Sequence, residues 1–359
     1  MNKAASVRVL LIGGPRAGGR NGCAEGMEVI SSNLGKRLGG VCKTFEIALP
    51  ALLKPGAMRD IRRFSPDIIH FLHGPSMKTL LACKALKLLT PGSKTVVSMT
   101  NPRIKAPWLW MLPALKPSLA LTQSGSVDFF LRGIGFETAF FPNGVDTERF
   151  KPAEGPRKLE IRRKYNIGPE RFVLLHVGHI RKNRGLDTLA RLQDSMKDIQ
   201  VVVAGSTRFT REEGIERRLK ASGCMIFVGY FESIDELYKL ADCYIFPVRA
   251  RGGGPFNRLS GSIETPLSVL EAMSTNLPVV STPYGALPEL FRPGGGLYFY
   301  ETGEQLEEAI RRIRAGGGQS GNRQLALHHE WRRLVLKLER IYRGLLAGEA
   351  DRLDKVPIV

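Results

Sequence analysis

The chain has 359 residues, a length that suggests two domains of ordinary size. Hydrophobic residues make up 43% of it, enough for two packed cores, which excludes a disordered or fibrous chain. Lysine and arginine outnumber aspartate and glutamate by 53 to 34, which gives a net charge of +19.

The cysteines and the apolar runs indicate a cytoplasmic protein. The five cysteines have no C-x-x-C spacing, so the sequence predicts free thiols rather than a zinc site or a disulfide framework. No uncharged apolar run reaches the ~20 residues that span a membrane. The first apolar run is too short for a signal peptide and predicts a strand.

The chain opens with a strand, a glycine turn and a helix, and it repeats this order near its middle. Residues 7–12 form a short β-rich run, followed by the glycine-rich residues 13–26 and a helical pattern. Residues 172–177 open the second unit, which continues through Gly178 and a basic loop into another helical pattern. Each unit is typical of the start of a doubly wound α/β domain.

Further apolar runs predict buried parallel strands in each half of the chain. Runs rich in Val, Ile and Phe and free of charge are typical of strands covered on both faces. They are residues 67–72, 95–99, 119–122, 138–141, 200–204, 225–228, 243–247 and 278–281. The sequence therefore predicts two Rossmann-like domains, residues 1–150 and 151–325. A final amphipathic helix within 326–347 is expected to cross back to the first domain.

Three sequence blocks follow one another in a fixed order between residues 141 and 290. Residues 141–152 (FPNGVDTERFKP) contain P-N-G-V-D followed by F-x-P, residues 266–273 read PLSVLEAM, and residues 277–289 end in GALPE. In this order the blocks closely resemble the interdomain signature and the donor-site block of glycosyltransferase family 4. The resemblance covers most of the chain and is weaker in the first 140 residues, where it is mainly one of layout.

The resemblance implies a particular architecture and activity. Proteins of this family have two Rossmann-like domains facing across a cleft, the GT-B arrangement, with a nucleotide-sugar donor on the second domain and the acceptor on the first. It also implies transfer with retention of anomeric configuration and without a metal or other cofactor. The sequence has no D-x-D, the metal–diphosphate motif of the other glycosyltransferase fold. A UDP- or GDP-sugar is the expected donor.

The turn at residues 178–185 carries cations that would face the donor diphosphate. Without a metal, cations and helix N-termini must stabilise the departing diphosphate. In the family this turn has an Arg after its first Gly and a Lys before its last; here these positions hold His179 and Arg184. We expect Arg184 to contact phosphate, with Arg181 or Lys182 replacing the missing arginine. The alternative is a solvated basic loop.

Residues 266–273 predict a helix whose N-terminus faces the donor. Proline is favoured at such a start, and the backbone N–H groups of Leu267, Ser268 and Val269 would bind the diphosphate. Glu271, one turn into the helix, would accept hydrogen bonds from ribose hydroxyls. The alternative for Glu271 is an ordinary surface glutamate.

The family's second glutamate, eight positions before Glu271, is replaced here by Ile263. Glu264 lies seven positions before Glu271, so a loop shortened by one residue would let Glu264 contact the sugar hydroxyls; otherwise the role is lost. Residues 249–262, which are glycine-rich and basic, would form either a mobile lid over the donor or an ordinary loop.

The first domain supplies candidates for the reacting centre. Gly18 and Gly19 lie in the loop that approaches the donor in this family, and glycine permits such close approach of backbone. The loop is not a G-x-G-x-x-G fingerprint, which disfavours NAD binding. His73 ends a predicted strand, where α/β folds bind ligands, and is the candidate catalytic histidine; Asn101 stands where many relatives have a histidine. A same-face retaining transfer needs no protein nucleophile, because the departing phosphate can deprotonate the acceptor.

The acceptor-side domain has an uneven charge. Residues 68–127 contain no acidic residue and seven basic ones: Lys78, Lys84, Lys87, Lys94, Arg103, Lys105 and Lys116. Residues 77–89 predict a basic amphipathic helix, and residues 107–115 add two tryptophans in an apolar context. This combination is typical of a membrane interface. It predicts peripheral docking on anionic lipid at the inner face of the membrane, toward a lipid-linked or cell-surface glycan acceptor. The alternative is a core segment with solvated lysines; no nucleic-acid-binding motif is present.

Two other functions stay open on the sequence alone. A nucleotide-sugar epimerase of the same fold would not carry the PNGVD and PLSVLEAM blocks. A non-catalytic GT-B scaffold or partner subunit bound to the membrane would explain His179, Asn101 and the shifted Glu264. Hydrolysis of a sugar nucleotide would distinguish an enzyme from a scaffold.

Overall fold

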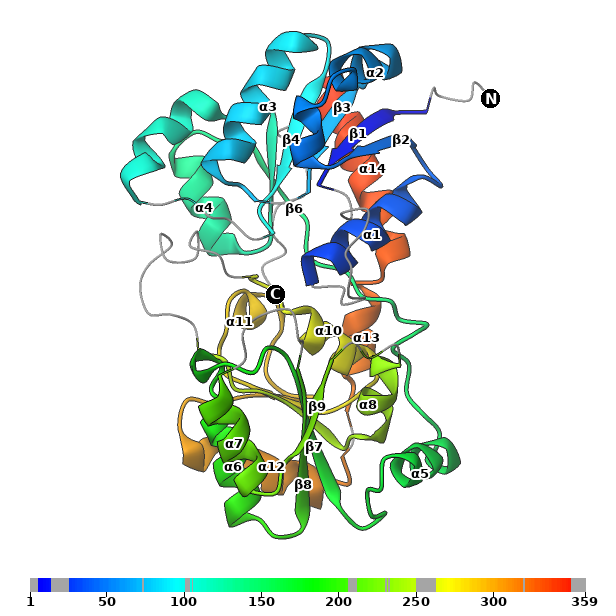
Figure 1. The fold of residues 1–359 in the computed structure, drawn as a ribbon, viewed down its shortest axis with the longest axis vertical. Helices are drawn as coiled ribbons and strands as arrows, with labels where there is room; N and C mark the ends of the chain where they lie inside the picture. The colour runs from blue at the N-terminus through cyan, green and yellow to red at the C-terminus, as the bar shows by residue number, and fades with distance from the viewer. Residues whose placement is uncertain are drawn as a thin grey trace.

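The structure is a computed structural model. It describes residues 6–13, 26–72, 74–100, 104, 106–205, 212–229, 231, 233–249, 263–318 and 320–349. Two six-stranded sheets organise the two halves of the chain (Figure 1), in the orders β2-β1-β3-β4-β5-β6 and β12-β11-β10-β7-β8-β9. All strand pairs are parallel. The predicted α/β class, with two doubly wound domains, is confirmed.

The strands lie where apolar runs predict them, apart from two edge strands. The first sheet contains β1 (Arg8–Ile12), β2 (Lys43–Ile47), β3 (Ile68–Phe71), β4 (Lys94–Ser98), β5 (Leu119–Thr122) and β6 (Thr138–Phe140). The second contains β7 (Phe172–Val177), β8 (Ile199–Gly205), β9 (Met225–Val228), β10 (Cys243–Phe246), β11 (Val279–Ser281) and β12 (Leu297–Phe299). β2 and β12 were not predicted: β2 (KTFEI) contains two charged residues at a half-exposed edge of its sheet, and β12 is a three-residue strand at the edge of the other.

Helices flank both sheets. Those of the first half are α1 (Gly26–Leu38), η1 (Leu49–Leu53), α2 (Ala57–Phe64), α3 (Met77–Leu89), η2 (Ala106–Leu115) and α4 (Gly125–Gly133). The second half has α5 (Gly155–Lys164), η3 (Lys182–Arg184), α6 (Leu186–Ser195), α7 (Glu213–Ala221), α8 (Ile234–Leu240), α10 (Leu267–Ser274), α11 (Leu287–Leu290), α12 (Gly303–Ala315) and α13 (Asn322–Leu327).

The last helix, α14 (Trp331–Ala347), returns to the first sheet, where it lies beside α1 (Figure 1). Trp331, Leu338 and Tyr342 are buried in the core cluster that also contains β1 and β5 residues. Both ring nitrogens of His70, a buried residue of β3, have hydrogen-bond partners. The Tyr342 hydroxyl lies 2.6 Å from His70 Nδ1, and Ser98 Oγ lies 2.7 Å from His70 Nε2. Burial lowers the pKa of His70 to about 3, so His70 is a neutral, structural residue.

Two chain segments cross between the halves side by side, and they explain the glycine of the PNGVD block. Val145 forms a parallel bridge with Glu330, and the Val145 N–H donates to the His329 carbonyl at 2.9 Å. A Cβ on Gly144 would lie 2.4 Å from the ring of Trp331. Any other residue would therefore force the two segments apart.

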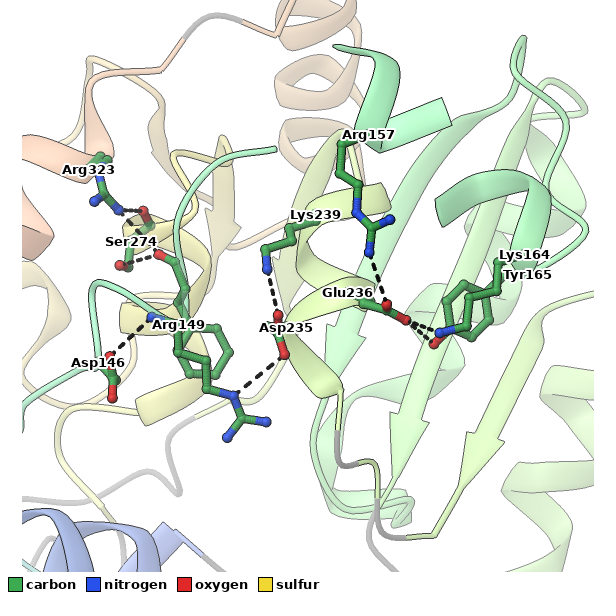
Figure 2. Close-up of polar contacts among 11 residues, drawn as sticks. Asp146, Arg149, Arg157, Lys164, Tyr165, Asp235, Glu236, Lys239, Ser274 and Arg323 are labelled. Carbon is green, nitrogen blue, oxygen red and sulfur yellow. Dashed lines mark hydrogen bonds and ion pairs between the residues drawn. The ribbon is translucent and has the colours of Figure 1, made fainter. Parts of the chain in front are cut away.

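The end of the first crossing segment is tied to the second domain by charged side chains. Arg323 of α13 donates to the carbonyl oxygens of Phe150 and Ser274, at 3.3 and 2.6 Å (Figure 2). Arg149 forms an ion pair with Asp235 of α8, with 3.5 Å between Nε and Oδ1 (Figure 2). These contacts fix the crossing segment beside α8 and α10.

Candidate active site

The basic turn at residues 178–185 packs against the carboxyl end of β10. Gly185 has a φ of +70°, and a Cβ at this position would lie 2.2 Å from the carbonyl oxygen of Pro247. Glycine therefore allows the turn to reach the ends of the central strands β7 and β10. This edge of an open parallel sheet is where α/β folds bind ligands.

Arg184 is the best-placed cation of the turn. Its side chain is half-buried beside the hydroxyl-bearing rings of Tyr244 and Tyr284, and burial lowers its pKa. A guanidinium remains charged at neutral pH even so. Within the described part of the chain, no carboxylate pairs with Arg184. A half-buried cation without a carboxylate partner is suited to an anionic ligand.

The neighbours of Arg184 differ in what they can contribute. Burial and the positive charges of Arg184 and Arg181 lower the pKa of His179 to about 4, so His179 is neutral at pH 7. Arg181 is half-buried, and its charge acts on both His179 and Arg184. Lys182 is exposed on η3, where its backbone N–H donates to Glu212 Oε2 at 3.0 Å. Arg181 and Lys182 were both expected to replace the missing arginine. Of the two, Arg181 is the one that is half-buried and whose charge acts on Arg184.

The N-terminus of α10 lies beside β10. Pro266 is its N-cap, without a side-chain cap. The Val269 N–H already donates to the Pro266 carbonyl at 3.2 Å, which argues against its expected role as a diphosphate donor. The N–H groups of Leu267 and Ser268 have no partner in the described part of the chain, so these two amides are the ones that can serve an anion.

A tyrosine of β10 holds the two halves of this site together. The Tyr244 hydroxyl hydrogen-bonds with the side chain of Ser268 and donates to the carbonyl of Val177 at 3.3 Å. It thereby ties the first turn of α10 to the end of β7. This residue was not anticipated, because a tyrosine inside an apolar strand pattern resembles a core residue.

Glu271 is held by a second tyrosine. Its Oε2 accepts a hydrogen bond of 2.7 Å from the hydroxyl of Tyr238, which is fully buried in α8. Burial raises the pKa of Glu271, while the Tyr238 hydrogen bond and the charge of Arg149 act in the opposite direction. The other carboxylate oxygen has no partner among the described residues and can accept from a ligand hydroxyl.

Glu264 lies in the loop that leads into α10 and is 2% exposed. Its backbone carbonyl accepts from the Ala286 N–H at 2.9 Å. Gly285 has a φ of +56°, and a Cβ there would lie 2.3 Å from the same carbonyl oxygen, which explains the glycine of the GALPE block. The neighbouring Ile263 instead packs beside Gly26 at the start of α1. The structure thus gives Glu264 and Ile263 different surroundings.

Replacing Glu264 by glutamine tests whether it contacts the sugar. We expect sugar transfer to fall by roughly tenfold or more, since a hydrogen bond from a charged group is worth about 1.5–3 kcal/mol. Binding of the free nucleoside diphosphate, measured by calorimetry, should change less than twofold. Unchanged transfer in Glu264→Gln would show that other groups contact the sugar.

Several expected site residues lie outside the described residues: Gly18, Gly19, His73, Asn101 and residues 250–262. The end of the glycine-rich segment is described, and a Cβ on Gly26 would lie 3.5 Å from Leu267 Cδ1. This places the start of α1 beside Leu267, the first residue of α10.

Among the residues that the structure describes, no group of three or more His, Cys, Asp and Glu side chains is arranged to hold a metal ion. The same residues include no helix with the length and apolarity to cross a membrane.

Comparison with known proteins gives a family for the second domain. Residues 171–315 match the family model described as Glycosyl transferases group 1. Sulfoquinovosyl transferase SQD2 of Arabidopsis thaliana is 25% identical over 289 residues, which cover 75% of this chain and 53% of that protein. Lipopolysaccharide core biosynthesis mannosyltransferase LpsB of Rhizobium meliloti (strain 1021) is also 25% identical, over 75% of this chain and 80% of that protein.

Solved structures show the same two-domain arrangement. Anabaena Alr3699/HepE in complex with UDP and glucose superposes with a TM-score of 0.69 at 14% identity, covering 94% of this chain and 100% of that chain. The fold is therefore that of the GT-B glycosyltransferases, as the resemblance predicted. The second domain matches the model of the Glycosyl transferases group 1 family, and both of these relatives are named as sugar-transferring enzymes.

Proposed function

We propose that this protein is a retaining, metal-independent glycosyltransferase that uses a nucleotide-sugar donor, with UDP- and GDP-sugars as the expected class. One observation carries the proposal: the Arg184 guanidinium, which pairs with no described carboxylate, and the Leu267 and Ser268 amides, which have no described partner, all lie at the carboxyl edge of the second sheet. A cation and a helix N-terminus together suit a diphosphate. The UDP bound in the HepE structure supports the same class of donor.

In this proposal the protein's residues stabilise the leaving group. The bond between the sugar C1 and the diphosphate oxygen breaks, and the acceptor oxygen bonds to C1 on the same face. The acceptor proton passes to the departing phosphate. Arg184 and the α10 amides stabilise the negative charge that grows on the diphosphate. Glu271 holds the ribose, and Glu264 the sugar.

Assays of the wild-type protein test this proposal. UDP-, GDP-, ADP- and dTDP-sugars are each incubated with the protein and a bacterial lipid extract, with EDTA present. We expect one donor class to release its nucleoside diphosphate, with NMR showing the donor's anomeric configuration in the product. Inversion would contradict the retaining mechanism, and no release from any donor would favour the non-catalytic alternative.

We further propose that the acceptor is lipid-linked or part of a cell-surface glycan and that the first domain docks on anionic membrane at the cytoplasmic side. α3, η2 and α4 pack on one shared core cluster, so they form one flank of the first sheet (Figure 1). Six large apolar side chains of these helices are exposed: Leu81, Leu88, Leu89, Trp108, Trp110 and Phe129. Trp110 and Phe129 are 77% and 82% exposed.

Lysines accompany these apolar side chains. Lys78, Lys84 and Lys87 are all exposed on α3, and Lys84 Nζ lies 3.4 Å from the Ala114 carbonyl of η2. Exposed aromatic and aliphatic side chains beside lysines suit the interface of an anionic bilayer. The two relatives are named for a sulfoquinovosyl transfer and for lipopolysaccharide core synthesis, and the second name supports a membrane-linked acceptor.

Charge reversal on α3 tests membrane docking. Each basic residue near an anionic surface contributes about 1 kcal/mol, so replacing Lys78, Lys84 and Lys87 by Glu should lower partitioning onto phosphatidylglycerol vesicles by ~100-fold or more. Binding should also weaken as salt shortens the screening length from ~10 Å at 0.1 M to ~3 Å at 1 M. Liposome sedimentation measures both effects.

The matched control reverses the same number of charges on the second domain. Arg217, Arg218 and Lys220 are exposed on α7, and their replacement by Glu should leave most of the vesicle binding intact. If the wild type binds neither anionic nor neutral vesicles at low salt, the membrane proposal is wrong and a soluble anionic acceptor explains the positive charge of the first domain better.

A further inference from the structure

A buried amide bridge joins the first sheet to the loop that precedes α10. The Asn143 Nδ2 group donates to the Thr265 carbonyl at 2.8 Å, and Asn143 Oδ1 accepts from Gln123 Nε2 at 2.7 Å. Gln123, Asn143 and Thr265 are 4%, 2% and 0% exposed, so the bridge is shielded from water. Gln123 follows β5 and Asn143 follows β6, whereas Thr265 belongs to the second domain.

The Thr265 carbonyl and the Gln123 amide together set the orientation of the Asn143 side chain. The Thr265 carbonyl is only an acceptor, so Asn143 must present its NH₂ group to Thr265 and its oxygen to Gln123. A donor at position 123 is what favours this orientation of the Asn143 amide over the flipped one. Without it, the Asn143 oxygen would lose its partner in a buried site, which is costly.

The bridge ends in the loop that leads into α10, residues 263–266, which we call the donor loop. Thr265 lies between Glu264 and Pro266, the N-cap of α10, and its carbonyl precedes the helix. Holding this carbonyl therefore fixes the backbone next to Glu264. Glu264, which would contact the sugar, is in this way positioned by the first domain.

A second contact from the same turn of the first domain supports this geometry. The backbone N–H of Gly125, two residues after Gln123, donates to Glu289 Oε2 at 2.6 Å. Glu289 ends the GALPE block, whose Ala286 N–H bonds the Glu264 carbonyl. The turn between β5 and α4 thus contacts the donor loop by two routes, one through Asn143 and one through α11.

We propose that Gln123 is a positioning residue for sugar transfer, acting through Asn143 and the Thr265 carbonyl on Glu264. This inference rests on the proposed glycosyltransferase function. Among the described residues, Gln123 makes no hydrogen bond with the turn at residues 178–185, so its loss should affect transfer more than the binding of a nucleoside diphosphate.

The test replaces Gln123 by methionine, which keeps the volume and removes the donor. We expect kcat for transfer to fall roughly tenfold, about the effect of one buried hydrogen bond, with the Kd of the nucleoside diphosphate within twofold of wild type. Gln123→Asn, which shortens the side chain and keeps the amide, should lose less than Gln123→Met. Thr138→Val is the matched control, because Thr138 is a buried polar residue of β6 whose hydroxyl has no partner in the described structure.

A double-mutant comparison separates positioning from general stability. If Gln123 acts through the loop that carries Glu264, adding Gln123→Met to Glu264→Gln should lower kcat by less than twofold further. A full tenfold additional loss would overturn the proposal, as would wild-type kcat in Gln123→Met. Equal losses in Gln123→Met and Thr138→Val would also overturn it, since the effect would then be one of packing.

Hydrogen exchange gives a measurement that does not depend on activity. In Gln123→Met, amides of residues 263–270 should exchange faster than in wild type and in Thr138→Val, while β7 and β8 stay protected. Unchanged exchange at residues 263–270 would overturn the bridge's role. If the wild type transfers no sugar, the proposed function fails, and the exchange result still decides whether the bridge holds the loop.

Discussion

Arg184→Ala should lower kcat for sugar transfer by about 10²–10³-fold, the cost of losing one group aimed at a developing charge. The guanidinium lies half-buried near Tyr244 and Tyr284 and has no carboxylate partner in the described structure, so it is available to the diphosphate. Negative charge on the diphosphate grows as the sugar leaves, so the cation contributes more to the transition state than to donor binding. Arg184→Lys keeps the charge and should retain much of the activity, with a loss of about tenfold.

The comparison needs a control at a neighbouring exposed arginine. Arg191 lies on the next helix, α6, and its only hydrogen bond to a described side chain is the one to Thr188 Oγ1, at 3.4 Å. Arg191→Ala should therefore keep wild-type kcat and KM. Equal rates in Arg184→Ala, Arg184→Lys and wild type would make Arg184 a solvated loop residue and would remove the cation from the mechanism.

Glu271→Ala should weaken donor binding by about 10–100-fold, the loss of a hydrogen bond to a charged group, while the fold survives. The carboxylate is oriented by Tyr238 through the 2.7 Å hydrogen bond to Oε2. Tyr238→Phe, which keeps the ring and removes the hydroxyl, should therefore show a smaller loss in the same direction. Calorimetry with the nucleoside diphosphate and with inorganic diphosphate shows whether the lost affinity depends on the ribose.

The pH dependence of donor binding adds a check on the same residue. Burial raises the pKa of Glu271, so its ionised form is lost at a higher pH than for an exposed glutamate. Donor affinity should accordingly decline on acidification, and this part of the decline should vanish in Glu271→Ala. Unchanged affinity in Glu271→Ala at every pH would place the ribose elsewhere.

The central strands of both sheets were predictable because they are continuous apolar runs covered on both faces. β5 and β7 begin and end where the sequence predicted. The edge strands β6 and β9 are apolar and were predicted too. The edge strand β2 has the sequence KTFEI and exposes Lys43 and Glu46, so a search for apolar runs does not find it.

The candidate site residues Arg184, Ser268 and Glu271 come from recognisable sequence blocks, and their roles stay predictions. The residues that contact them could not be found in this way. Tyr238 and Tyr244 lie in apolar patterns typical of core, and only their hydroxyl contacts show their role. Gln123 belongs to no motif, and its importance arises from a contact with Asn143 across 20 positions of sequence.

On the surface of the first domain, the sequence predicted the helix α3 but not every exposed apolar side chain. The helix expected at residues 77–89 has those bounds in the structure, and Ser76 caps it by accepting a hydrogen bond from the Thr79 N–H. Phe129 was not anticipated on the exposed face, because the helical pattern of α4 does not show which of Phe129 and Phe130 faces solvent. The structure exposes Phe129 and packs Phe130 against the core.

The most direct test of the account is thermal unfolding of the wild-type protein with UDP-, GDP-, ADP- and dTDP-sugars, each in the presence of EDTA. At about 100 times its Kd, a bound donor stabilises by ~2.7 kcal/mol, which corresponds to a rise of roughly 5–10 °C for a domain of this size. The account predicts such a rise with one donor class, undiminished by EDTA and strongly reduced in Glu271→Ala. No shift with any of these donors at millimolar concentration would contradict the claim that the second domain binds a nucleotide-sugar.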